Sequence, residues 1–177
     1  MTGKQVRQVR REGNLAYVTL TKGYEAVIDA FDVPLIDGWN WYAMVERRHA
    51  GSIRAVYAVR RDRTGEGKRR MVRMHRVIAG TPDGLETDHR DGNGLNNRRG
   101  NLRAATKAQN MQNQGIRTNN SSGHKGVSWE AARGKWRARI RLGGKRKSLG
   151  LFTTPEEAAA AYATASAAMH GEFGRTT

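Results

Sequence analysis

Residues 85–106 read LETDHRDGNGLNNRRGNLRAAT. This pattern indicates a strand that ends near His89, a loop rich in Gly and Asn, and a second short strand. Thr106 then has the side chain of a helix N-cap, and Gln109 three residues later completes a capping box. Gly115 is the residue type that ends such a helix. We therefore expect the middle of the chain to fold in the order strand, loop, strand, helix.

Asp88 and His89 stand side by side at the end of the first of these strands. If the later strand and helix fold back on it, Asn110 can join them in one cleft. A carboxylate and an amide oxygen suit a hard divalent cation, and the imidazole of His89 can take a proton from an attacking water. Asn101 is central in the loop, so we expect its amide to hold the loop and aim the imidazole. On these residues alone an ordinary turn stays the alternative, since Asp and Asn are common in turns.

Three segments together resemble the HNH homing-endonuclease family in its phage form: MHRVI at 74–78, the segment 85–106, and Gln-Asn at 109–110. The resemblance covers about residues 73–114. It implies the ββα-metal fold and a metal-dependent endonuclease that nicks or cuts double-stranded DNA. It assigns the general base to His89, the loop-ordering role to Asn101, and the ligands of a divalent metal ion (Mg²⁺, with Mn²⁺ as the alternative) to Asp88 and Asn110. A DNA-binding regulator with a non-catalytic HNH scaffold is the alternative function.

The charge balance points to a polyanionic partner. The chain has 177 residues, with 32 Lys and Arg against 16 Asp and Glu, which gives a formal net charge of +16. Nucleic acid is the first candidate, with RNA as the rival of duplex DNA, and an anionic membrane surface is the second. The absence of a long apolar run and of a signal-peptide core predicts a protein without a membrane partner, in the cytoplasm of a prokaryotic or phage-infected cell. The absence of cysteine excludes disulfides and thiolate-bound zinc.

A basic strand is expected at residues 135–142, which read KWRARIRL. Strand side chains alternate between faces, so Arg137, Arg139 and Arg141 share one face, and Trp136 and the aliphatic residues share the other. Gly-Gly at 143–144 predicts a hairpin turn to a third strand at 145–152. Residues 154–157, TPEE, then open an Ala-rich helix that can cover the apolar face. A solvated charged face is the alternative to a DNA-binding one.

This part of the chain also resembles the AP2 domain, over about residues 123–177. The resemblance rests on HKGVSW at 124–129, GKWRARI at 134–140, SLGLF at 148–152 and TPEEAAAAY at 154–162. It implies a three-stranded sheet that binds in the DNA major groove. Ser128 and Ser148 depart from the plant members, so their base preference does not carry over. The implied DNA contacts are Lys125, Trp129, Arg137, Arg139, Arg141 and Arg146.

We thus predict an α+β chain with a strand-rich N-terminal region (1–72), an HNH nuclease unit (73–116), a linker (117–122) and an AP2-like three-stranded antiparallel sheet packed on one helix (123–177). Trp39, Trp41 and Tyr42 are expected to anchor a small core, with a binding platform as the alternative. His75 is expected to have a structural or DNA-backbone role. The oligomeric state and the role of the N-terminal region stay open.

Overall fold

The computed structural model describes residues 8–48, 51–63, 67–117 and 119–176. Residue 118 of the expected linker and the first seven residues, where a signal peptide was sought, lie outside the described residues. The chain forms two compact units, Met1–Ala104 and Ala105–Thr177. Helices and several small antiparallel sheets occur together, which confirms the α+β class. The boundary between the units falls inside the segment expected to form one HNH unit.

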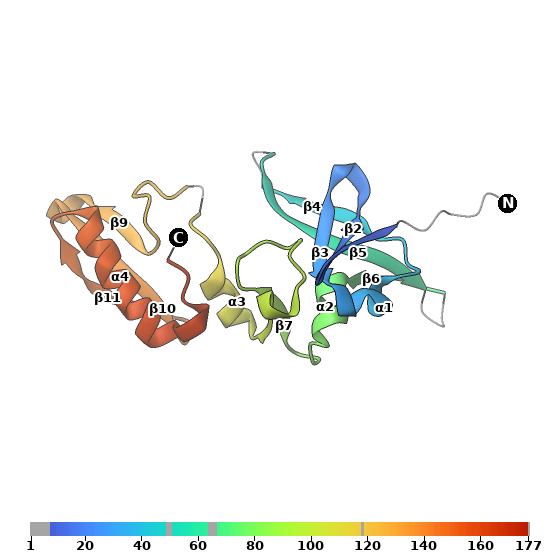
Figure 1. Cartoon of the computed structure of the whole chain (residues 1–177). Coiled ribbons are helices and arrows are strands. Elements are labelled where there is room, and N and C mark those ends of the chain that lie inside the picture. Colours follow the sequence, from blue (N-terminus) through green and yellow to red (C-terminus); the bar gives the residue numbers. More distant parts are fainter. Residues whose placement is uncertain (1–7, 49–50, 64–66, 118, 177) are drawn as a thin grey trace. The chain divides into compact units, whose positions relative to one another are not determined.

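The first unit contains three small sheets, in the orders β1-β2-β3, β4-β5-β6 and β7-β8 (Figure 1). Each pairing in the first two sheets is antiparallel and joins strands that follow one another in the chain. The elements of this unit are β1 (Val9–Glu12), β2 (Leu15–Thr19), β3 (Glu25–Asp29), α1 (Val33–Ile36), β4 (Tyr42–Arg47), β5 (Ile53–Arg63), β6 (Arg69–Arg73), α2 (Met74–Ala79), β7 (Glu86–His89) and β8 (Leu102–Ala105).

One core joins the N-terminal strands to the segment that resembles an HNH domain. Ile28 of β3, Trp41, Met74 and Ile78 of α2, and Leu102 of β8 are all buried in it. Burial of such side chains contributes about 1.5–3 kcal/mol each. The N-terminal region therefore shares one core with α2 and β8.

The predicted aromatic core is confirmed for Trp41 but not for Trp39. Trp41 is buried, and its indole Nε1 donates a hydrogen bond to the carbonyl oxygen of Ile36 at 2.9 Å. Trp39 is instead 42% exposed, and the guanidinium carbon of Arg60 lies 3.3 Å from its ring centroid. Arg60 is thus held by stacking on an aromatic ring, which favours a structural role for its guanidinium group.

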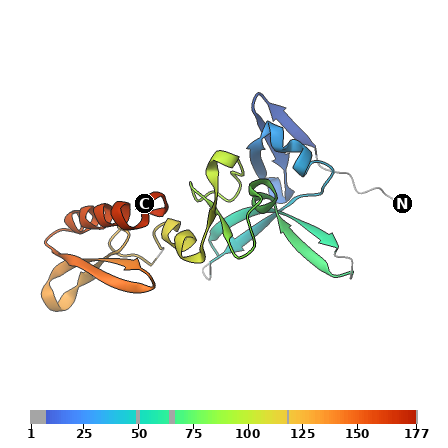
Figure 2. The same ribbon diagram turned by 90° about the horizontal axis from the view of Figure 1, so that it is seen from below.

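The second unit begins with α3 (Lys107–Asn113), whose Thr106 and Gln109 form the predicted capping box. It continues with β9 (Val127–Glu130), β10 (Lys135–Leu142), β11 (Lys145–Phe152) and α4 (Pro155–His170), and the sheet order is β11-β10-β9. Helix α4 covers one face of this sheet (Figures 1 and 2). Ala138 of β10 and Ala158 of α4 are fully buried between them, because small side chains let a helix lie close to a sheet.

Gly126 occupies a position where a side chain would not fit. Its φ is +75°, and a Cβ atom there would overlap the ring of Tyr162 and the carbonyl oxygen of Arg139. We expect Gly126→Ala to destabilise the second unit by about 2–4 kcal/mol, from strain at positive φ and overpacking against the ring. Denaturant unfolding of the full chain measures this loss.

Gly134→Ala is the matched control, since Gly134 has φ +57° but nothing within 4 Å of a Cβ atom. It should show only the backbone strain, about 1–2 kcal/mol. Equal losses in the two variants would contradict the expected clash with Tyr162.

Candidate active site

Asp88 and His89 lie at the end of β7 and are both buried, with 4% and 6% of their surfaces exposed. Arg103 lies on the neighbouring strand β8 and is also buried. Its Nε donates a hydrogen bond to Asp88 Oδ2 at 2.8 Å, and its Nη2 lies 2.7 Å from the same oxygen. The carboxylate is therefore held by a buried ion pair. Arg103 was not predicted from the sequence, although a lone arginine in the otherwise apolar segment 102–105 is a usable signal.

His89 belongs to a cluster of three rings. Its ring centroid lies 5.0 Å from that of His75 and 6.1 Å from that of Tyr57, and His89 Nε2 lies 3.4 Å from Asn97 Oδ1. Burial lowers the pKa of His89, while the bond to Asn97 and the charges of Asp91 and Asp88 oppose that shift. The imidazole is thus neutral at neutral pH, the form that can accept a proton.

Burial lowers the pKa of His75 in α2 as it does that of His89. Burial, then the neighbouring His89, lowers the pKa of His75 to about 3, so the ring is uncharged at neutral pH. A buried neutral ring does not attract a phosphate, so the structure favours the structural role over the DNA-backbone role. Neither Tyr57 nor the packing of His75 on His89 was expected, because only tertiary contacts bring these rings together.

The loop between β7 and β8 is tied together by Asn101. Its Nδ2 donates hydrogen bonds to Asp91 Oδ1 at 2.9 Å and to the carbonyl oxygen of Asn96 at 2.8 Å. Its Oδ1 accepts a hydrogen bond from the backbone N–H of Asp91 at 3.1 Å. A side chain that satisfies three loop groups at once fixes the loop that follows His89.

The N-terminal region holds the other end of this loop. The backbone N–H of Asn97 donates to the carbonyl oxygen of Val27 in β3 at 2.8 Å, and the Asn97 side chain is fully buried. Arg99 donates from Nε and Nη2 to the buried carboxylate of Asp32 at 3.0 and 2.7 Å. Gly94 lies against Tyr57 so closely that a Cβ atom would overlap its ring. The strand-rich first part of the chain thus shapes the loop beside Asp88 and His89.

The predicted arginines of β10 share one face of the sheet in the second unit. Arg137 is opposite Ser128 of β9, and Arg141 is opposite Arg146 of β11; directly opposed side chains lie on the same face. Arg137 pairs with Glu130, and Arg139 Nη2 lies 3.4 Å from Ser128 Oγ. These contacts order the arginines along one surface.

Trp129, another of the sequence-predicted DNA contacts, lies on the other face of the sheet from these arginines, and its contact with DNA stays a prediction. It is opposite Trp136 in the sheet, with the ring centroids 5.2 Å apart, and its side chain is 50% exposed. Lys125, also predicted to contact DNA, is only partly exposed. Its ammonium donates hydrogen bonds to the carbonyl oxygens of Gln112 and Gln114 at 2.5 and 2.7 Å.

Asn110 lies on α3, in the second unit, so its joining of Asp88 and His89 stays a prediction. Among the residues that the structure describes, no group of three or more His, Cys, Asp or Glu side chains could hold a metal ion. The expected ligand set contains only one carboxylate, and an amide and a substrate phosphate complete it, so this finding does not conflict with that set. No helix in the described ranges is long and apolar enough to cross a membrane.

Comparison with known proteins gives the class first. A model of the HNH endonuclease family matches residues 72–112, the part that contains α2, β7, β8 and most of α3. The chain therefore carries an HNH endonuclease domain, which implies nuclease activity and DNA binding. It is also 37% identical over 94 residues to Protein 3.8 of Escherichia phage T7, which covers 53% of this chain and 77% of that protein. The chain belongs to the family of Protein 3.8. No solved structure matches it.

Proposed function

We propose that the chain is a metal-dependent DNA endonuclease of the homing type, which hydrolyses phosphodiester bonds in double-stranded DNA. The observation that carries this proposal is the buried Asp88–His89 pair at the end of β7. Its carboxylate is held by Arg103, its imidazole is uncharged, and its loop is fixed by Asn101. Such a fixed base beside a fixed oxygen donor suits phosphodiester hydrolysis.

In this proposal Asp88 and Asn110 hold the divalent metal, Mg²⁺ or Mn²⁺, with one carboxylate and one amide oxygen. The bound metal supplies charge stabilisation for the phosphate and the leaving 3′ oxygen. The imidazole of His89 takes the proton of the attacking water. Asn97 orients the ring of His89, Arg103 fixes the carboxylate of Asp88, and Asn101 fixes the loop that follows His89.

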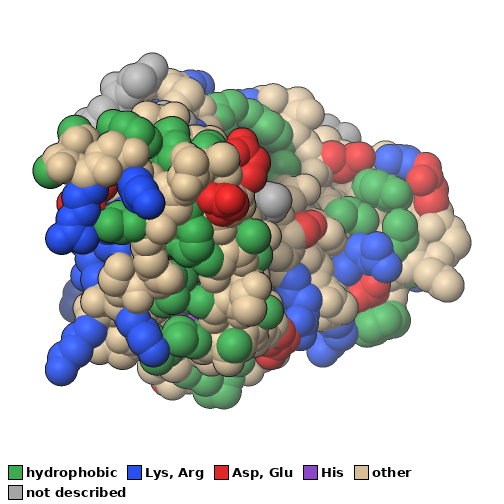
Figure 3. Space-filling view, turned by 90° about the vertical axis from the view of Figure 1, so that its left-hand side faces the viewer, with side chains coloured by type: hydrophobic (Ala, Val, Ile, Leu, Met, Phe, Trp, Pro, Cys, Tyr) green, Lys and Arg blue, Asp and Glu red, His purple; other side chains and the backbone are tan. Residues whose placement is uncertain are grey.

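The second unit is proposed to bind the DNA with the open face of its sheet, in the manner of an AP2 domain. Arg137, Arg139, Arg141 and Arg146 lie on that face, where they can contact phosphates or guanine edges. Figure 3 looks onto the side where Figure 1 shows α4 and the β9–β11 sheet. Lys and Arg side chains line the left edge of this view, and others lie among the Asp and Glu side chains at its centre and right.

One observation favours the second candidate, a DNA-binding regulator with a non-catalytic HNH scaffold. Arg103 already supplies the positive charge that a metal ion would otherwise bring to the carboxylate of Asp88. The two candidates differ in one measurable property, since only the nuclease changes the covalent structure of the DNA.

The test is the incubation of the full chain with supercoiled plasmid in Mg²⁺, Mn²⁺, Ca²⁺ or excess EDTA, followed by mapping of the product ends. We expect nicked or linear plasmid in Mg²⁺ or Mn²⁺, with 3′ hydroxyl ends, and no product in EDTA. Retained plasmid binding without any cut in all metals would establish the regulator instead. Equal cleavage in EDTA would contradict the metal dependence.

A further inference from the structure

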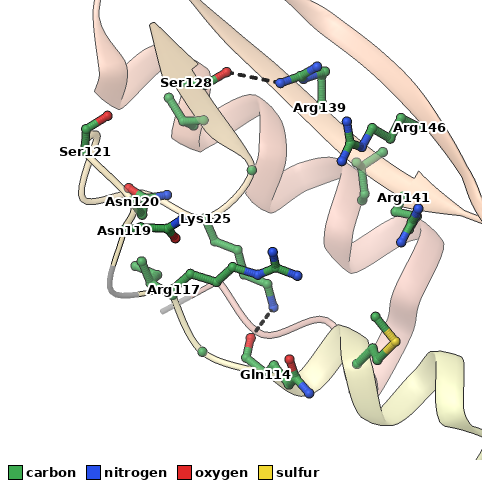
Figure 4. Close-up of a pocket in the computed structure, with 16 residues that line it drawn as sticks. Gln114, Arg117, Asn119, Asn120, Ser121, Lys125, Ser128, Arg139, Arg141 and Arg146 are labelled. Atoms are coloured by element: carbon green, nitrogen blue, oxygen red, sulfur yellow. Dashed lines mark hydrogen bonds between the residues drawn. The ribbon is translucent and has the colours of Figure 1, made fainter. Parts of the chain in front are cut away.

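The second unit contains a pocket of about 470 Å³ (Figure 4). The pocket is separate from Asp88 and His89, and the sheet forms only part of its lining. Its walls come from the end of α3, residues 114–117 and 119–121 after it, the residues that lead into β9, and parts of β10 and β11. A concave site with walls from several segments can surround a ligand group rather than touch it from one side.

The lining of this pocket carries charge of one sign. Of its sixteen residues none is Asp or Glu, and five are cations: Arg117, Lys125, Arg139, Arg141 and Arg146. Amides and hydroxyls of Gln114, Asn119 and Ser128 add donors to the same wall. Cations gathered in a hollow raise the local concentration of anions, because low-dielectric walls focus their field.

Backbone carbonyl oxygens, rather than carboxylates, hold one of these cations in place. Lys125 is fixed by its bonds to the carbonyl oxygens of Gln112 and Gln114, and burial, with the charge of Arg175, lowers its pKa to about 8. Arg117 extends beside Lys125 into the hollow (Figure 4). Within the described ranges Arg117, Arg139, Arg141 and Arg146 form no salt bridge. An anion is thus the missing partner of this set of charges.

We propose that this pocket binds a phosphate group of the DNA backbone, and that Arg117 makes a phosphate contact separate from those of the sheet face. The inference rests on the proposed function in one respect, that the second unit binds duplex DNA. The backbone is favoured over a free phosphate because Arg139, Arg141 and Arg146 line the pocket and also continue along the sheet face. A phosphate bound in the pocket would therefore have further arginines beside it on the sheet face, and these could contact the next phosphates of the same strand.

The test measures the affinity of the full chain for a short duplex DNA at several salt concentrations. Arg117→Ala should weaken binding about tenfold, as the loss of one charge-assisted hydrogen bond does. It should also make the slope of log affinity against log salt less steep by about 0.9. Arg133→Ala is the matched control, an exposed arginine of the same unit outside the pocket, and it should bind as the wild type does. Unchanged unfolding midpoints establish that both variants fold.

Two further arms separate this inference from the proposed function. Arg137 lies on the sheet face but does not line the pocket. If Arg137→Ala weakens DNA binding and Arg117→Ala leaves both affinity and slope unchanged, the pocket inference is overturned while DNA binding by the sheet stands. If the wild type does not bind duplex DNA, both are overturned. If inorganic phosphate binds the wild type tightly and depends on Arg117, but DNA binding does not, the pocket is a free-phosphate site and the backbone assignment is wrong.

Discussion

Replacing His89 by Ala is expected to lower the rate of plasmid cleavage by about 10²–10⁴-fold, the usual contribution of a positioned general base. His89 is buried beside Asp88, its pKa is lowered by burial, and Asn97 orients its ring. Alanine removes the proton acceptor but leaves the ion pair of Asp88 and Arg103 intact. Cleavage is measured as the rate of loss of supercoiled plasmid in Mg²⁺, with the enzyme in excess over the DNA.

DNA binding should survive this change, because the arginine face lies in the second unit. A gel shift in Ca²⁺ or EDTA measures it under conditions without cutting. His124→Ala serves as the matched histidine control, since His124 lies in the second unit and does not line the pocket or the sheet face. Cleavage by the His89 variant at the wild-type rate would show that another group takes the proton of the water.

In the second unit, sequence patterns predict most of the secondary structure correctly. The strands at 135–142 and 145–152 and the helix opened by Thr154 have the bounds that alternation, the Gly-Gly turn and the capping box predict. These signals are local, so tertiary packing had little to change. Leu142 is an exception: it was expected under the helix but is 45% exposed, because the covered apolar stripe ends at Ile140.

In the first unit, the same kinds of pattern miss several elements and contacts. The strand β6 (Arg69–Arg73) is mostly exposed and rich in arginine, so its sequence does not resemble a strand, and only its pairing with β5 identifies it as one. Helix α2 has just six residues, but Met74 and Ile78 at helical spacing and Gly80 with φ +57° mark it in retrospect. The site itself depends on such long-range contacts. Asp88 and His89 were found from neighbouring residues in the sequence, whereas Arg103 and the ring of His75 were not.

Arg103→Ala is expected to destabilise the first unit by about 3–5 kcal/mol, because it leaves the buried carboxylate of Asp88 without its compensating charge. Arg98→Ala is the matched control. Arg98 is half exposed and its Nε lies 3.5 Å from Asp29 Oδ1, so its loss should cost about 0–1 kcal/mol. Denaturant unfolding in EDTA measures both.

Adding Mg²⁺ turns this same variant into a test of the metal ligand. If Asp88 holds a divalent cation, the metal can replace the charge of Arg103, and it stabilises the native state in proportion to its binding. Mg²⁺ should therefore raise the stability of Arg103→Ala more than that of the wild type, whose carboxylate oxygen Oδ2 is already bound by the guanidinium. The double variant Asp88→Asn with Arg103→Ala should lose this gain, because a neutral amide attracts the cation weakly. An equal response of the single and double variants would exclude Asp88 as a ligand, and would leave its pairing with Arg103 as the reason why a carboxylate is buried at the end of β7.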